Sequence, residues 1–330
     1  MFISYNLVEF GDKLKSLRKE LGLSQTDIQD NAGVSVDALR RIEKGEVIPR
    51  YETLELLSSI YKQDLLELLK SSRNNKLLTE YYDELDHLLA FYDDNKMKLL
   101  EEDIRKSFTG NERSTIVNPN EVIQLLLFIR GTTLHHSRIS SDHKDAQNLL
   151  MDALKLTIPN FNINSFKTYN YSYIELRILL FLSILIAQGN GVKISNEILY
   201  FILDKLQNNS TSKYLNFLVI KIYSNLAYNY HLQDNHKKVI EISNEGITYS
   251  LNNETTHRLY LLYYRKGIAE YFLKDPNYLE ALYSALTTLK ITNQHDLLEV
   301  YLEVMKEKYD INIPADISEL LFKNHLPQKV

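Results

Sequence analysis

Apolar residues recur at helical spacing along most of the chain, in stretches that end at Asn, Asp, Gly or Pro. This period predicts amphipathic helices and no sheet. Beyond residue 75 the expected helices are 76–94, 96–108, 119–136, 142–157, 171–188, 194–208, 212–232, 236–250, 254–274, 277–291, 295–309 and 315–323. Because only short polar segments join them, we expect neighbouring helices to pair as antiparallel hairpins.

The first seventy residues have a different rhythm, with shorter helices separated by glycines. Ser24 is followed three residues later by Asp27, as in a capping box that begins a helix. That helix is expected to end at Gly33, where glycine can take the left-handed conformation. Ser35 is the expected N-cap of a second helix, over 36–43. Two short helices joined by a tight turn predict a helix-turn-helix.

The second of these helices has one apolar and one polar side. Leu39 and Ile42 fall on the side that faces the domain core. The outward positions are Val36, Asp37, Arg40, Arg41 and Lys44. This arrangement is typical of a helix that enters the major groove of DNA with its N-terminal half.

The segments 21–25 (Leu-Gly-Leu-Ser-Gln), 32–35 (Ala-Gly-Val-Ser) and 40–45 (Arg-Arg-Ile-Glu-Lys-Gly), with Pro49 and 52–54 (Glu-Thr-Leu), carry a clear likeness. Over about residues 9 to 69 the chain resembles the Cro/repressor-type, or XRE, helix-turn-helix family. The resemblance implies a five-helix domain, here 1–72, that binds a double-stranded DNA operator.

The resemblance also implies roles for individual side chains. Arg18 is expected to pair with Glu43 and so to tie the first helix to the third. Asp37 leaves two interpretations open: it accepts from a cytosine amino group, or it only caps the helix and repels phosphates. The full set implied for DNA is Gln25 and Ser35 on phosphates, Val36, Asp37 and Arg40 at base edges, and Arg41, Lys44 and Arg50 beside the backbone.

Charge refines this expectation. Within 1–72, ten Lys and Arg face twelve Asp and Glu, so the domain as a whole is not basic. The segment 40–50 alone has four cations and two acids. This balance predicts modest DNA affinity for one domain, and therefore a homodimer on a two-fold operator. The last helices, 295–309 and 315–323, are candidates for the dimer interface or for a cap.

A weak internal repeat marks the helical region, 73–330. At an offset of 41 residues, Tyr230, Leu232, Asp234 and Ser243 coincide with Tyr271, Leu273, Asp275 and Ser284. Each set spans a long helix, a polar turn and a second helix, which resembles the tetratricopeptide repeat. The resemblance implies a right-handed superhelix whose concave face is lined by the first helix of each hairpin. A bundle without repeats is the alternative.

A helix-turn-helix domain followed by such hairpins resembles, in architecture, the cytoplasmic peptide-pheromone receptors of Gram-positive bacteria, the Rgg, PlcR, PrgX and NprR types. The resemblance implies a quorum-sensing regulator, in the cytoplasm, whose second domain binds a short linear signalling peptide and modulates the DNA-bound dimer. The alternative is a repressor whose repeats bind another protein.

Within the second domain, polar residues at helical spacing are the candidates for peptide contact. Lys221, Asn225 and Asn229 form one stripe, and carboxamides can pair with the main chain of an extended peptide. Arg258 and Arg265, one heptad apart, are candidates for a peptide carboxylate. Both asparagines are expected to point into the groove, although such stripes often only face water.

Composition excludes several other classes. Gly (10) and Pro (6) are scarce, which favours an all-α chain over a turn-rich fold. With no Cys and no metal-type His spacing, we expect neither disulfides nor a metal site, and no cofactor. Phosphate-loop and nucleophile-elbow motifs are missing from the sequence, so no enzymatic activity is expected. We expect no membrane span, because the apolar runs fall short of the ~20 residues that a span needs.

Overall fold

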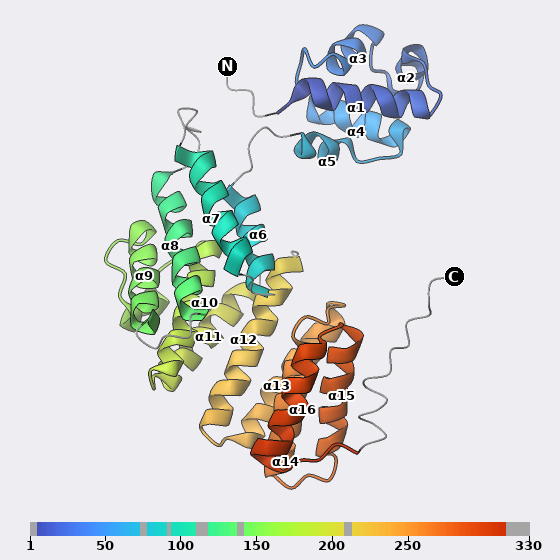
Figure 1. Cartoon of the computed structure of the whole chain (residues 1–330). Coiled ribbons are helices and arrows are strands. Elements are labelled where there is room, and N and C mark those ends of the chain that lie inside the picture. Colours follow the sequence, from blue (N-terminus) through green and yellow to red (C-terminus); the bar gives the residue numbers. More distant parts are fainter. Residues whose placement is uncertain are drawn as a thin grey trace. The chain divides into compact units, whose positions relative to one another are not determined.

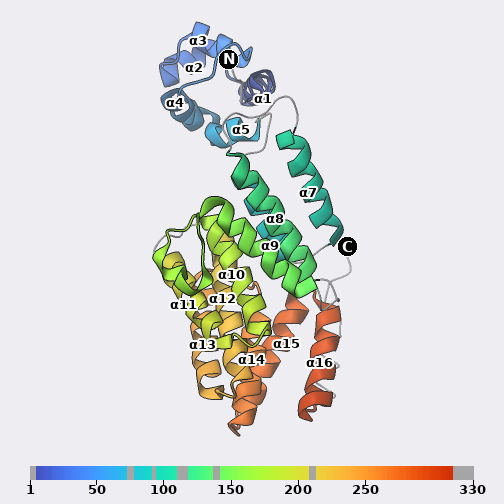
Figure 2. The ribbon, with the colours of Figure 1, turned by 90° about the vertical axis from the view of Figure 1, so that its left-hand side faces the viewer.

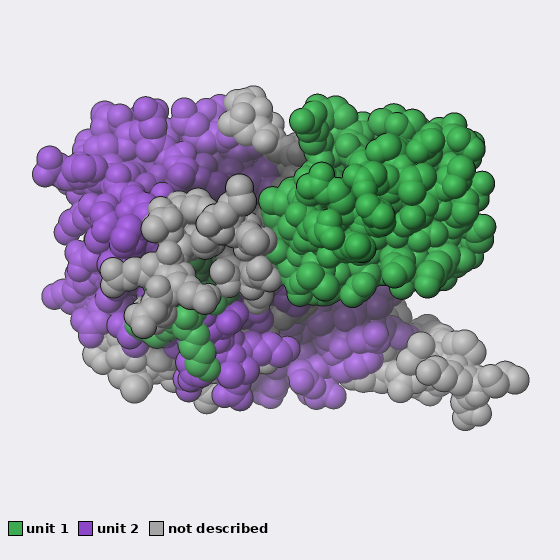
Figure 3. All heavy atoms as spheres, turned by 90° about the horizontal axis from the view of Figure 1, so that it is seen from above, with its two compact units in different colours: residues 1–81, 105–112 green, residues 82–104, 113–330 purple. Residues whose placement is uncertain are grey.

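The structure is a computed structural model that describes residues 5–72, 78–90, 94–109, 118–136, 142–207 and 213–314. All secondary-structure elements in these ranges are helices (Figure 1), which confirms the predicted all-α class. The chain divides into two compact units, 1–81 with 105–112 and 82–104 with 113–330 (Figure 3). We call them the first and second unit and describe each by itself.

The first unit contains the five predicted helices of the helix-turn-helix domain. They are α1 (Leu7–Glu20), α2 (Gln25–Ala32), α3 (Val36–Glu43), α4 (Tyr51–Tyr61) and α5 (Leu65–Ser71). Polar side chains set their starts: Asn6 and Ser35 accept from the third backbone N–H of α1 and α3, and Asp64 accepts two N–H groups of α5. These local bonds explain why the helix boundaries follow the sequence pattern so closely.

One apolar core joins these five helices. Its members that are at most 1% exposed are Phe10, Leu14, Ile28, Leu39, Leu57 and Leu65. The two predicted inward residues of α3, Leu39 and Ile42, both belong to it. A methyl group on Gly11 would lie 2.5 Å from the carbonyl oxygen of Glu43, so this glycine permits the close approach of α1 to α3. The core therefore fixes α3 with its polar side outward.

The second unit consists of longer helices that pack as successive hairpins (Figure 2). The chain's later helices are α6 (Leu78–Ala90), α7 (Asp94–Thr109), α8 (Pro119–His136), α9 (Asp142–Thr157), α10 (Tyr173–Gln188), α11 (Val192–Gln207), α12 (Lys213–Leu232), α13 (His236–Asn252), α14 (Leu259–Phe272), α15 (Tyr278–Ile291) and α16 (His295–Tyr309). A short 3-10 helix, Ile163–Thr168, was not predicted. The predicted helix 315–323 lies outside the described residues.

The largest error among the predicted boundaries concerns α14. It begins at Leu259 and not at residue 254, because Glu254 (φ 50°) and Arg258 (φ 51°) both take the left-handed conformation. Two left-handed residues so close together prevent a continuous helix across this segment. The loop before α14 brings Arg258 to the first turn of that helix.

The turns reveal a repeat that is more regular than the sequence. Left-handed residues follow α12, α13, α14 and α15 at Asp234, Glu254, Lys274 and Asn293, with φ between 50° and 59°. At each, the next residue donates its N–H to the carbonyl five positions earlier, for example Asn235 to Tyr230 and Asp275 to Glu270. Because Lys274 and Asp234 are equivalent, one hairpin spans 40 residues, and the sequence match at 41 is one residue out of register.

The first and second helices of the hairpins differ in how they contact neighbouring hairpins. The first helices of neighbouring hairpins contact each other, α8 with α10, α10 with α12, and α12 with α14. Within the described residues no comparable contact joins the second helices α9, α11, α13 and α15. First helices that converge while second helices diverge produce a surface that curves toward the first helices. This geometry agrees with the predicted face formed by the first helix of each hairpin.

No helix among the described residues is long and apolar enough to cross a lipid bilayer. The most apolar helix, α10, is buried along nearly its whole length by the other helices of the second unit.

Candidate functional site

The candidate DNA-reading surface begins with the turn between α2 and α3. Ser24 and Asp27 form the predicted capping box, with the Ser24 N–H donating to Asp27 Oδ2 at 2.7 Å and the Asp27 N–H donating to Ser24 Oγ at 3.0 Å. Gly33 ends α2 with φ 68°, as predicted, and Ser35 Oγ accepts from the Ala38 N–H at 3.2 Å. These contacts confirm the predicted helix-turn-helix geometry.

A buried ion pair ties α1 to the C-terminal end of α3. Arg18 Nε lies 2.6 Å from Glu43 Oε1, its Nη2 lies 2.9 Å from Oε2, and its Nη1 donates to the Leu23 carbonyl at 2.9 Å. The predicted pair is therefore confirmed. Gln25 Nε2 also donates to Glu43, at 2.9 Å, so this side chain supports the network in addition to any contact with phosphate. Sequence reasoning did not foresee that second role for Gln25.

The outward side of α3 carries the predicted cations. Arg40, Arg41 and Lys44 have side chains that are 57%, 52% and 60% exposed, and Arg50 is exposed at the start of α4. Val36, at the first turn of α3, is half-buried, and its N–H donates to Gln29 Oε1 at 3.1 Å. Arg40, Arg41 and Lys44 are therefore accessible on α3, as contact with DNA would require.

Acidic neighbours lie within reach of the three cations Arg40, Arg41 and Lys44. Arg40 Nη2 is 2.6 Å from Asp37 Oδ1, while Glu46 lies 3.9 Å from Arg41 Nε and 3.8 Å from Lys44 Nζ. Asp37 thus has a role that neither sequence interpretation included, since it orients Arg40 across one helical turn. Exposed pairs of this kind are weak and can exchange partners.

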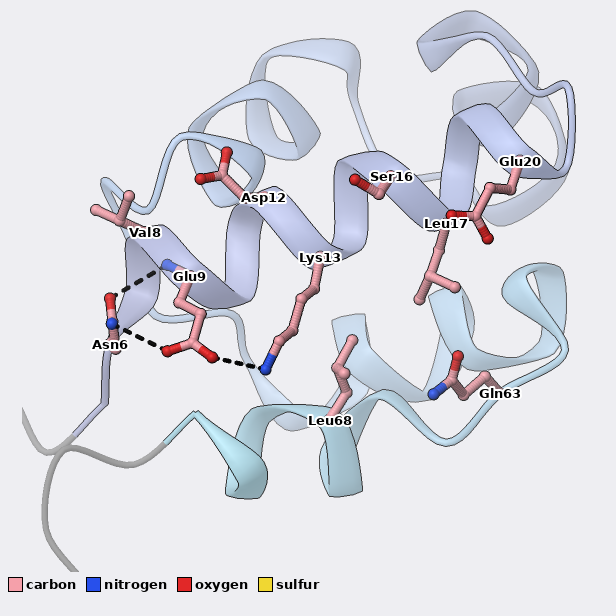
Figure 4. Close-up of a pocket in the computed structure, with 10 residues that line it drawn as sticks. All are labelled: Asn6, Val8, Glu9, Asp12, Lys13, Ser16, Leu17, Glu20, Gln63 and Leu68. Atoms are coloured by element: carbon pink, nitrogen blue, oxygen red, sulfur yellow. Dashed lines mark hydrogen bonds and ion pairs between the residues drawn. The ribbon is translucent and has the colours of Figure 1, made fainter.

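A hollow in the first unit differs in charge from the exposed side of α3. It lies between α1 and α5 (Figure 4), and Glu9, Asp12 and Glu20 line it with a single cation, Lys13, whose Nζ is 2.7 Å from Glu9. A surface with this balance repels phosphate. Within the first unit the α3 face is therefore the better candidate for DNA.

The candidate ligand site in the second unit is a small pocket among the first helices. Its described lining comes from α6, α8, α10, α12 and the residues just before α14. The lining residues are Leu89, Phe128, Arg177, Leu180, Phe181, Phe217, Leu218, Lys221, His257 and Arg258. Lys221 and Arg258 were predicted ligand residues, whereas Arg177 and His257 were missed because no local pattern connects them.

The three residues of the predicted polar stripe have different surroundings. Lys221 Nζ lies 4.2 Å from the centroid of the Phe181 ring, at the pocket. Asn225 is half-buried and donates to the Lys221 carbonyl of its own helix at 2.7 Å. Asn229 is only 2% exposed and donates to Ser195 Oγ and Asn196 Oδ1 of α11, at 3.0 and 2.7 Å. The predicted orientation of Asn229 is wrong, because its amide fills the α11–α12 interface.

The two arginines predicted to meet one carboxylate also have different surroundings. Arg258 lines the pocket. Arg265 packs against aromatic side chains, with Cζ 4.6 Å from the centroid of the Tyr228 ring, and is not among the lining residues. Burial lowers the pKa of the Arg265 guanidinium. The expectation that one carboxylate meets both arginines therefore does not fit this geometry.

Comparison with known proteins supports the assignment of the N-terminal segment to a helix-turn-helix domain. Residues 14–68 match the family model described as helix-turn-helix. The cryptic phage CTXphi transcriptional repressor RstR of Vibrio cholerae is 33% identical over 66 residues, which are 20% of this chain and 60% of the repressor. The N-terminal segment is thus a helix-turn-helix domain, and the match spans about three fifths of the curated relative.

Solved structures resemble the chain over nearly its whole length. PlcR of Bacillus thuringiensis, in complex with the peptide PapR7 and DNA, has a TM-score of 0.62 at 16% identity and covers 89% of this chain and 99% of its own. ComR from S. thermophilus, in complex with DNA and its signalling peptide ComS, has a TM-score of 0.54 at 14% identity and covers 92% and 100%. These likenesses confirm, at the level of fold, the predicted architecture of a helix-turn-helix followed by helical repeats.

Proposed function

We propose that this chain is a transcription regulator that binds a two-fold DNA operator as a homodimer in the cytoplasm, and that its second domain binds a short signalling peptide. The observation that carries the proposal is the presence, in one chain, of an exposed cationic face on α3 and of a ligand pocket formed by the first helices of the repeats. The fold shared with PlcR and ComR supports the combination. We place the functional boundary between the domains at residues 72 and 73.

For DNA, the exposed side of α3 supports the division of labour implied by the sequence. Val36, Asp37 and Arg40 occupy the N-terminal half of α3, where a recognition helix meets base edges. Ser35 is the N-cap of that end, whereas Gln25, at the start of α2, donates to Glu43 at the other end of α3. Arg41 and Lys44 lie toward the C-terminal end of α3, and Arg50 precedes α4. Phosphate contacts position such a domain and base contacts specify its sequence.

The balance of charge in the first domain supports the proposed homodimer. The first domain has more acids than cations, so one copy gains little from counterion release. Two copies on a two-fold operator add their contacts at an effective concentration set by the dimer. Similarity to a phage repressor supports a regulatory role.

For the peptide, Lys221, Arg258 and Asn225 are the proposed contacts among the predicted residues. The first two line the pocket, and Asn225, one turn along α12 from Lys221, is half-buried. We do not propose Asn229 or Arg265, because packing within the second unit engages both side chains. The competing function, a repressor whose repeats bind another protein, requires a broader surface than this narrow pocket.

The test uses the full chain and a library of random 40-base-pair DNA duplexes. Rounds of selection and sequencing should enrich a two-fold-symmetric site, and the retained complex should contain two copies of the chain by mass. A pool of random octapeptides should shift the affinity for the selected site. Absence of enrichment would refute the DNA-binding proposal, while enrichment without any response to peptides would favour the protein-binding alternative.

A further inference from the structure

The last described helix, α16, has the position of a first helix, but no second helix follows it among the described residues. In the four preceding hairpins each first helix contacts the second helix that follows it: α8 with α9, α10 with α11, α12 with α13 and α14 with α15. Helix α16 contacts α15, the second helix of the hairpin before it (Figure 2). The described chain therefore ends halfway through a hairpin, at Pro314.

The apolar side of α16 is wider than the core that covers it. Leu298 and Met305 are fully buried, in a cluster with residues of α14 and α15. A second apolar row lies beside them: Leu297 is 36% exposed, Val300 is 49% exposed and Val304 is half-buried. These three residues are three and four positions apart, so they follow one line along the helix. We call them the exposed row; its contiguity indicates a surface that another element covers.

The chain turns back immediately after α16 ends. Asp310 takes the left-handed conformation, with φ 54°, and the Ile311 N–H donates to the Met305 carbonyl at 3.0 Å. Ile311 is 3% exposed, and Ile313 packs against the same core cluster. The chain is thus held at the C-terminal end of α16 as far as Ile313. A segment that continues from there needs no long connection to run back along α16.

The length of chain that remains fits a second helix. Three to five residues separate the two helices of each preceding hairpin, and five separate the end of α16 from residue 315. At 1.5 Å per residue, the helix predicted over 315–323 is about 13 Å long and the exposed row extends over about 10 Å. One short helix at the expected position is long enough to cover the row.

The residues of this segment also have the polarity that such a helix needs. Ile317, Leu320 and Leu321 have the spacing of one apolar helix side. Asp316 and Glu319 fall on the opposite side. A terminal element that covers an apolar face and presents a polar face to solvent is what closes an array of stacked hairpins.

We propose that residues 315–323 form the second helix of the last hairpin and pack their apolar side on the exposed row of α16. The occupant is this segment of the same chain, because the turn at Asp310 directs it to that surface. A second copy of the chain, packed on the same row, is the competing occupant. The proposal does not depend on the proposed function.

The chain has no cysteine, so a disulfide between two introduced cysteines locates the segment without interference. In the full chain, Val300→Cys is combined in turn with Ile317→Cys, Leu320→Cys and Leu321→Cys, which covers the registers open to the segment. Glu299→Cys, exposed on the polar side of α16, replaces Val300→Cys in the matched controls. In a glutathione buffer at least one Val300 pair should form an intramolecular disulfide about tenfold faster than its control, because a disulfide requires close Cβ atoms.

A stability measurement tests the same contact independently. Leu320→Asp places a charge on the apolar side of the segment and should lower the thermal midpoint of the full chain by about 2–4 °C. Glu319→Gln, on the opposite side, should leave the midpoint unchanged. Circular dichroism verifies that the cysteine variants are folded.

The possible results separate the two occupants. Non-reducing electrophoresis and intact mass distinguish a disulfide within one chain from a disulfide between chains. A Val300 disulfide that joins two chains would overturn the proposal and assign the exposed row to a second copy. Equal rates for the Val300 and Glu299 pairs, no disulfide in any pair, or equal midpoints for Leu320→Asp and Glu319→Gln would also overturn it.

Discussion

The cations of the two units have opposite surroundings. On α3, Arg40 and Lys44 are more than half exposed, and each lies within 4 Å of a carboxylate close to it in sequence. In the second unit Arg177 is 1% exposed against aromatic rings, and burial lowers the pKa of Arg265. Water screens the first group, so its members exchange partners at little cost. The second group is fixed and weakly screened.

This difference matches two kinds of recognition. A DNA backbone presents many equivalent phosphates, for which adaptable surface cations are sufficient. A single ligand group must be selected from many, which favours fixed charges in a confined space. The comparison predicts that changes to buried charges cost stability, whereas changes to exposed charges alter only binding and its salt dependence.

The largest effect on stability is expected at the Arg18–Glu43 pair, which is buried although the cations of α3 in the same unit are exposed. Arg18→Ala should destabilise the first unit by about 3–5 kcal/mol, because Glu43, 3% exposed, is left as a buried carboxylate without its cation. The bond to Glu43 raises the pKa of Arg18, as expected for a pair that stabilises the charged forms. Hydrogen exchange of α1 and α3 amides in the full chain measures the loss. Lys13→Ala, which removes an exposed pair, is the control, and a similar loss in both variants would contradict the comparison.

The two units should also differ in how far acid lowers their stability. Residues 5–72 contain no histidine, whereas the pKa of His257 is lowered to about 3 and that of His231 is also lowered by burial. Between pH 6.5 and 3 the unfolded chain binds a proton at His257 that the folded chain does not, so stability falls as pH decreases below 6.5. By pH 5 the second unit should lose about 2 kcal/mol from this residue. Urea unfolding at pH 7 and pH 5 tests this, with His257→Gln expected to reduce the loss.

A third test concerns the two asparagines of α12. Asn229→Ala should destabilise the second unit by about 2 kcal/mol, because Ser195 and Asn196 lose a buried partner. Asn225→Ala should have little effect on folding, since its amide bonds only to its own helix at a half-buried position. Thermal unfolding of both variants decides this. Equal stability of the two would restore the groove orientation first predicted for Asn229.

These asparagines also mark where sequence reasoning stopped. The capping box of α2 and the left-handed Gly33 were predicted correctly because their partners lie within four residues. Because Asn225 and Asn229 are four residues apart, the sequence correctly indicates that they share one side of α12. It does not indicate which other helix packs against each of them. The partners of Asn229 are more than thirty residues away in the chain, on α11. Only the packing of α11 on α12 decides which amide is buried.

The pocket was predictable only in part for the same reason. Lys221 and Arg258 stood out as polar positions on first helices, and both line it. Arg177 precedes a stretch, 178–187, in which Ser183 is the one polar residue, and His257 lies in a loop whose left-handed Arg258 no local pattern indicates. Five separate segments meet there, and the order of helices does not specify which side chains converge. The hairpin rhythm predicted the fold, whereas the chemistry of the cavity depends on tertiary contacts.

The smallest expected effects lie on the α3 face, where they separate base contact from backbone contact. Arg40→Ala should weaken binding to the selected operator by about 1 kcal/mol, the low end for a base contact, because Arg40 must first leave Asp37 at 2.6 Å. Binding to unrelated DNA should hardly change. Lys44→Ala should weaken both and make the slope of log affinity against log salt shallower by about one unit for the lost phosphate contact. Fluorescence anisotropy from 50 to 200 mM salt measures both quantities, and Arg40 would lose its base-reading role if its substitution reproduced the uniform loss of Lys44→Ala.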